Sequence, residues 1–160
     1  MKRQRGIALL TGLVLSLLAG LLAASALREA LVQVHMAGQL RASAQALEQA
    51  EAVLLEGRAR LWLAPPGPCQ RCRPPADAHD VQGGEPGWQS AEQGFFLLQN
   101  LGESTLVAHV PDGARARLYR VTAVSRQQQA RHVLEAVYAL QPGPNATLRR
   151  ILWRQRLREP

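Results

Sequence analysis

The stretch MKRQRGIALLTGLVLSLLAGLLAASALREA (residues 1–30) decides the fold and the location of this 160-residue chain. Three cations precede an uncharged run from Ile7 to Leu27. About 20 apolar residues are enough to cross the hydrocarbon core of a bilayer as a helix. Because flanking cations stay on the cytoplasmic side, the N-terminus should face the cytoplasm. We therefore expect residues 7–27 to form a transmembrane helix, with the remainder of the chain outside the cytoplasm.

The residues after the apolar run indicate whether this segment is kept or removed. Ala24-Ser25-Ala26 has the small residues of a signal-peptidase site, so a secreted protein cut after Ala26 is one alternative. Against it, apolar residues recur every three or four positions from Leu27 to Leu61, and no proline precedes Pro65. This pattern predicts one unbroken helix from about residue 7 to about residue 63, roughly 85 Å long. Its second half, residues 28–63, is amphipathic.

The remainder of the chain predicts a loop followed by a sheet. Residues 64–94 are rich in proline and glycine, which indicates a loop. Five short apolar runs separated by turn signals then follow: GFFLLQN (94–100), STLVAHV (104–110), RARLYRVTAVSR (115–126), ARHVLEAVYAL (130–140) and TLRRILWRQRL (147–157). The fourth run would also suit a helix by its period, but its β-branched residues favour a strand. We expect an α+β fold in which an antiparallel sheet of about four or five strands, within residues 95–160, packs on the amphipathic helix.

This order of elements resembles that of type IV pilins. In that family a short basic leader ending in glycine precedes an apolar helix, as MKRQRG precedes IALLTGLVLSLLAG here. Met36-Ala37-Gly38, followed by the run QALEQAE (residues 45–51), is similar to the N-terminal region of PilX-type minor pilins. The resemblance covers about residues 1–60. It implies a pilin-like fold, a leader of residues 1–6, cleavage after Gly6 by prepilin peptidase and N-methylation of Ile7.

Thr11 departs from the pattern of major pilins. By resemblance, its position would hold a glutamate that pairs with the terminal amine of a neighbouring subunit. A carboxylate buried in lipid without a partner costs several kcal/mol or becomes neutral. A subunit without such a neighbour is therefore better served by threonine, and PilX-type members often lack the glutamate too. Thr11 favours a subunit of the tip or initiation complex over one repeated along the shaft.

Cys69 and Cys72 form the sharpest local pattern outside the helix. In an exported protein a disulfide is the default state of such a pair. It would close a tight loop and fix the shape of that loop more than it would raise the stability of the fold. Three other uses fit less well. A c-type haem motif needs histidine where Arg73 stands, a thioredoxin-like motif needs a helix start, and a zinc site needs two more ligands.

Charge and the remaining motifs limit the other functions. The net charge is +7, and Lys2 is the only lysine. The basic C-terminal run would place four arginines on one face of a strand and Trp153 on the other, towards the core. Two interpretations stay open: a solvated edge that discourages aggregation, or a strip that binds DNA phosphates. The four arginines are Arg150, Arg154, Arg156 and Arg158.

We expect no enzymatic activity, cofactor or metal, since the histidines (His35, His79, His109 and His132) have no catalytic or ligand spacing. By resemblance, we expect a minor pilin that primes type IV pilus assembly and sits at or near the tip. Its partners would be other minor pilins, the assembly machinery, prepilin peptidase and the inner membrane, with a DNA or surface contact at the tip as an addition. It would start in the bacterial inner membrane with its head in the periplasm and end at the cell surface. The alternatives are a pseudopilin of a type II secretion system and a DNA-binding subunit of a competence pilus.

Overall fold

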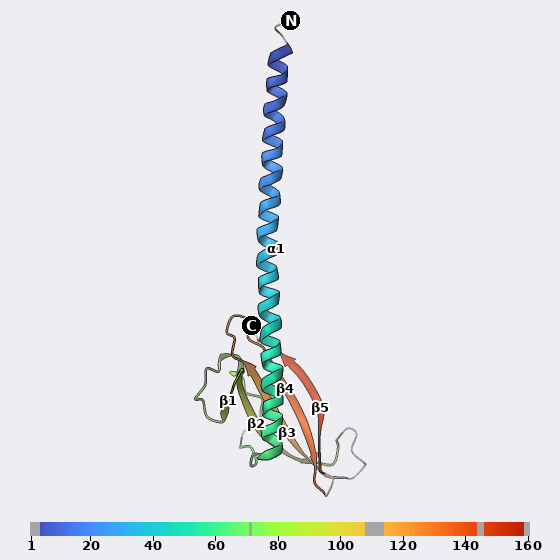
Figure 1. Cartoon of the computed structure of the whole chain (residues 1–160). Helices are drawn as coiled ribbons and strands as arrows, with labels where there is room; N and C mark the ends of the chain where they lie inside the picture. Colours follow the sequence, from blue (N-terminus) through green and yellow to red (C-terminus); the bar gives the residue numbers. More distant parts are fainter. Residues whose placement is uncertain (1–3, 71, 108–113, 144–145, 159–160) are drawn as a thin grey trace. The chain divides into compact units, whose positions relative to one another are not determined.

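A computed structural model shows one long helix and a five-stranded sheet (Figure 1). The structure describes residues 4–70, 72–107, 114–143 and 146–158, apart from the side chains of residues 4–6 and 8. Helix α1 spans Gln4–Leu63, in agreement with the helix predicted over residues 7–63. The chain divides into two compact units, residues 1–41 and 42–160.

The first unit contains only the N-terminal part of α1. Each of its described side chains from Ile7 to Arg41 is exposed. The segment is long and apolar enough to cross a membrane, with a mean hydropathy of 2.1 over its most apolar part. Exposed leucines and valines recur throughout this part, so it offers an apolar surface to lipid or to other helices.

The second unit is a head in which an antiparallel sheet has the strand order β1-β2-β3-β4-β5. Each strand pairs with the next one along the chain, so the topology is a simple meander. Two β-bulges interrupt the ladders, one at Leu101 in β2 and one at Ile151 in β5. The strands are β1 (Trp88–Ala91), β2 (Gly94–Ser104), β3 (Ala116–Ser125), β4 (Val133–Gln141) and β5 (Thr147–Arg156).

The C-terminal part of α1 covers one face of the sheet. Its buried residues recur at helical spacing and meet Phe96, Tyr119, Val121, Leu134 and Ala136 in one apolar core. This stripe begins later than the sequence predicts, since Leu40 and Ala44 are exposed. The buried helix residues are Ala46, Ala50, Val53, Leu54, Gly57 and Leu61.

The segment between α1 and β1 covers part of the opposite face. Ala78, in the short 3-10 helix η1 (Ala78–Asp80), packs against Val124 and Val133 of the sheet. This segment falls within residues 64–94, which we predicted as loop. The prediction missed η1 and the four-residue strand β1, which pairs with the start of β2.

Four of the five apolar runs form strands. In its described part the run STLVAHV (104–110) forms no strand of its own: β2 ends at Ser104, and Leu106 and Val107 have no regular structure. Residues 108–110 of this run lie outside the described residues. The ambiguous run at 130–140 does form a strand, β4.

Candidate functional site

The apolar part of α1 carries the residues predicted to act in processing and assembly. Ile7 and Thr11 lie on the helix with exposed side chains, and Gly6 is helical in its backbone. The predicted leader falls partly outside the described residues, since residues 1–3 are not described. Burial of this helix surface in lipid or against other helices is favourable, because its apolar side chains are then removed from water.

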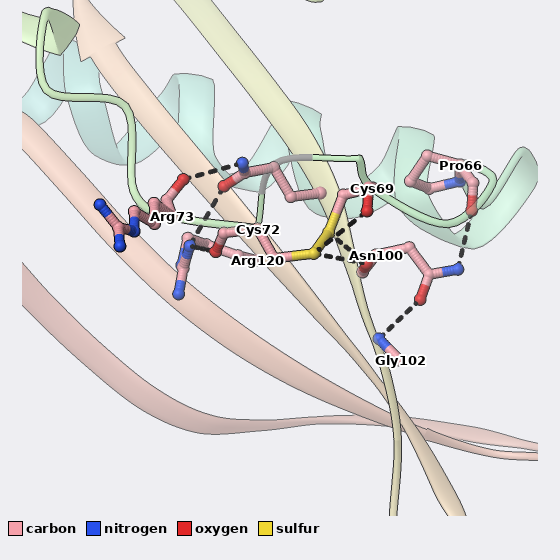
Figure 2. Close-up of a disulfide and its surroundings, with 8 residues drawn as sticks. Pro66, Cys69, Cys72, Arg73, Asn100, Gly102 and Arg120 are labelled. Atoms are coloured by element: carbon pink, nitrogen blue, oxygen red, sulfur yellow. Dashed lines mark hydrogen bonds between the residues drawn. A yellow bond between two sulfur atoms is a disulfide. The ribbon is translucent and has the colours of Figure 1, made fainter.

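Cys69 and Cys72 form a disulfide that fastens the segment after α1 to the sheet (Figure 2). The backbone N–H of Cys69 donates to the carbonyl oxygen of Asn100 at 3.3 Å. The side-chain amide of Asn100 donates to the carbonyl of Pro66 at 3.1 Å, so β2 holds the segment at Cys69 and at the preceding Pro66. The disulfide is therefore part of a fixed surface, as the sequence predicted.

Arg120 of β3 completes this attachment. Its guanidinium donates to the carbonyl of Cys72 at 2.9 Å and to the side-chain oxygen of Gln99 at 3.2 Å. Gln99 in turn donates to the carbonyl of Arg73 at 3.0 Å. Burial lowers the pKa of the Arg120 guanidinium. Three side chains of the sheet (Gln99, Asn100 and Arg120) thus satisfy carbonyls of the segment that could not pair within a regular element.

A buried carboxylate organises the arginines of β5. Glu135 of β4 is 1% exposed and accepts from Arg154 at 2.6 Å and from Arg156 at 3.4 Å. Arg156 also donates to the carbonyl of Pro75 at 2.6 Å. Sequence reasoning missed Glu135, although it is the one charged residue in the apolar stretch of β4 and lies opposite Arg154 in the register.

A second polar cluster joins η1 to the end of the chain. Arg158 and Asp80 form an ion pair. Arg131 donates to the carbonyls of His79 and Val81 at 3.0 and 2.5 Å. The pKa of His79 is lowered because burial and the nearby cations Arg158 and Arg156 disfavour its charged form.

These contacts change the interpretation of the predicted arginine strip. The bulge at Ile151 shifts the register, so Arg150 pairs with Tyr138 while Arg154 pairs with Glu135. Arg150 therefore lies on the same face as Trp153, towards α1, and the four arginines do not share one face. Trp153 is 44% exposed and is not a core residue.

The ion pairs weaken the case for a phosphate-binding strip. Arg154, Arg156 and Arg158 each have a carboxylate partner, so their charges are already partly neutralised. DNA contact stays a prediction. Among the residues that the structure describes, no cluster of His, Cys, Asp and Glu could hold a metal ion. His109 lies outside those residues.

Comparisons of the chain with models of known protein families, with curated proteins and with solved structures found no match.

Proposed function

We propose that this chain is a structural minor pilin of the PilX type, which primes the assembly of a type IV pilus and sits at or near its tip. One observation carries the proposal. A single helix, α1, begins with an apolar segment whose described side chains are exposed, and its later residues form the core of a sheet-containing head. A signal peptide that is removed has no need to continue into the structural helix of the mature protein.

The mechanism follows from the surface of the apolar segment. In the membrane, lipid buries the exposed side chains from Ile7 to Leu27. On extraction into a fibre, equivalent helices of neighbouring subunits bury the same side chains. Because one apolar environment replaces another, extraction need not cost the full free energy of transfer to water. The head stays in the aqueous phase throughout and presents its surface to other subunits.

Thr11 supports a place at the tip or in the initiation complex. A threonine hydroxyl can bond to a carbonyl of its own helix and needs no charged neighbour. A Thr11→Glu variant should therefore be poorly incorporated at the wild-type site. Assembly of this variant along the shaft as readily as the wild type assembles at its own position would contradict the assignment.

The decisive experiment is N-terminal sequencing and intact mass of the mature protein from its own host. We expect an N-methylated isoleucine at Ile7. A start at Leu27 would identify a cleaved signal peptide, and an intact Met1 would identify a simple membrane anchor; either result overturns the proposal.

A pseudopilin of a type II secretion system would be processed in the same way, so a second measurement is needed. Deletion of the coding sequence should reduce the number of surface pili and leave protein secretion unchanged. Loss of secretion with normal pili would assign the chain to the secretion system instead.

A further inference from the structure

β5 forms one edge of the sheet. β5 is the last strand in the sheet order, and within the described residues it pairs only with β4. An edge strand of ten residues presents a row of unpaired N–H and C=O groups. Such an edge can accept a further strand, whose backbone groups would continue the ladder.

A groove lies between this edge and α1. Its first part, about 700 Å³, is lined by Leu55, Arg58, Trp62, Leu63 and Leu148. Its second part, about 450 Å³, is lined by Leu55, Arg58, Tyr138, Arg150 and Trp153. The two parts share Leu55 and Arg58 and so form one continuous groove along the helix. We call this feature the α1–β5 groove.

The α1–β5 groove is apolar and open to solvent. Leu55, Trp62 and Leu63 are 62%, 52% and 77% exposed, which is unusual for large apolar side chains that lie together on a head. Exposed apolar patches with a polar rim are typical of sites where another protein binds. The groove therefore has the character of an interface, and its charges indicate the kind of partner.

The charges favour an acidic partner over a second copy of β5. β5 contains four arginines and no acidic residue. A second copy of β5 would bring no carboxylate to Arg150, whereas like charges that face one another across a strand pair are destabilising. Arg58 and Arg150 line the groove without an ion pair among the described residues, whereas Glu51 is the only carboxylate in its lining. The net charge of the groove is therefore positive.

The bulge at Ile151 fixes the order of groups that a partner would meet. Leu148, Arg150 and Trp153 pair with Leu140, Tyr138 and Ala136 of β4, so all three lie on the face towards α1. Along β5 the groove thus presents an apolar, a cationic and again an apolar side chain. A complementary strand has an acidic residue between two apolar ones, in alternate positions.

We propose that the α1–β5 groove binds an extended segment of another protein, in which acidic and apolar residues alternate on one face, and that this segment adds a sixth strand to the sheet beside β5. Its backbone pairs with the free edge, its apolar side chains cover Leu55, Trp62 and Trp153, and its carboxylate contacts Arg150 and Arg58. This inference is independent of the proposed pilus function.

The test uses the full-length chain in nanodiscs and a fluorescent nine-residue peptide. Every second residue of the peptide is threonine, and the residues between the threonines are alternately leucine and glutamate. In the control peptide, lysine replaces each glutamate. We expect the glutamate peptide to bind at least about tenfold more tightly, and Arg150→Glu to remove that preference. Arg115→Glu, an equal change of charge at an exposed residue outside the groove, should retain it.

Hydrogen exchange distinguishes strand addition from simple attraction of charge. The bound glutamate peptide should slow exchange of those β5 amides that do not pair with β4. The proposal is overturned if neither peptide binds, if the two bind equally, if Arg150→Glu keeps the preference, or if bound peptide leaves β5 exchange unchanged.

Discussion

At Glu135 a carboxylate lies in the middle of the sheet with 1% of its side chain exposed. Arg154 and Arg156 are its ion-pair partners among the described residues, and they differ in exposure, at 52% and 18%. A buried charge is tolerated only when it is paired and hydrogen-bonded, so this carboxylate depends on β5 being in place. Removal of the carboxylate would leave Arg156 partly buried without a counter-charge.

We expect Glu135→Gln to lower the free energy of unfolding by about 3 kcal/mol, because breaking a buried ion pair leaves the partner as an uncompensated charge. Arg154→Gln should cost only about 1 kcal/mol, since Glu135 keeps Arg156 and the lost cation was half in solvent. Arg117→Gln, which removes the exposed pair with Glu103, is the control and should leave the free energy of unfolding nearly unchanged. Denaturant unfolding of the full chain in detergent, followed by tryptophan fluorescence, gives all three values. Equal costs for Glu135→Gln and Arg117→Gln would contradict the assignment.

His79 makes stability depend on pH. Its pKa is lowered in the folded head, chiefly by burial and then by Arg158 and Arg156. The unfolded chain therefore binds a proton at a higher pH than the folded chain does. As pH falls below the ordinary histidine value of 6.5, stability should decrease until the pH reaches the lowered folded pKa, and this contribution should then level off.

Unfolding midpoints measured between pH 7.5 and about pH 5 test this expectation. His79→Gln should flatten the dependence in this range, whereas His35→Gln, a change in the other unit, should leave it unchanged. An equal slope in the wild type and in His79→Gln would show that another group is responsible.

At the scale of elements, α1 packs against the sheet at Gly57 without room for a side chain. A Cβ built there would lie 2.6 Å from a methyl carbon of Val121 and 3.3 Å from the ring of Phe96. Glycine thus lets the helix approach the sheet at this point. On the same helix, Gly38 has nothing within 4 Å. Alanine at position 38 therefore changes helix propensity alone, whereas alanine at position 57 also adds a packing conflict.

We expect Gly57→Ala to destabilise the head by about 1 kcal/mol, because an overpacking cost of about 2 kcal/mol exceeds the gain of about 1 kcal/mol in helix propensity. Gly38→Ala should leave the unfolding midpoint of the head unchanged, because it lies outside that unit. Thermal unfolding followed by circular dichroism compares the two variants. A Gly57→Ala protein more stable than the wild type would mean that α1 lies further from the sheet.

The elements also show what the sequence could predict. The helix was predictable to within three residues at its start because its periodicity is local, and β3, β4 and β5 followed from their apolar runs. β1 was missed because four residues in a proline- and glycine-rich segment become a strand only by pairing with β2. The predicted face of Arg150 was wrong because of the bulge at Ile151. This bulge arises in the pairing of β5 with β4 and cannot be seen in the sequence of β5 alone. The disulfide was predictable, but its anchoring by Asn100 and Arg120 was not, since these residues are distant in sequence.

At the scale of the whole molecule, one chain must suit two environments. The first unit offers an exposed apolar helix, whereas the second has its own apolar core and a surface rich in arginine. Residues 7–27 carry no charge, so this segment can enter lipid without a desolvation cost from ionised groups. The membrane affinity of the chain should therefore depend on these residues and be insensitive to charge added further along α1.

We expect Leu13→Arg combined with Leu17→Arg to release the protein from membranes, since each arginine near the centre of a spanning helix costs about 3 kcal/mol. The control combines Leu31→Arg with Leu40→Arg, which adds the same charge at exposed positions beyond residue 27 and should leave the protein in the membrane. Carbonate extraction of isolated membranes, followed by immunoblotting, measures the fraction retained. Wild-type protein in the soluble fraction would indicate cleavage after Ala26. Retention of the Leu13 and Leu17 variant would show that residues 7–27 are not the anchor, and release of the control would extend the anchor along α1.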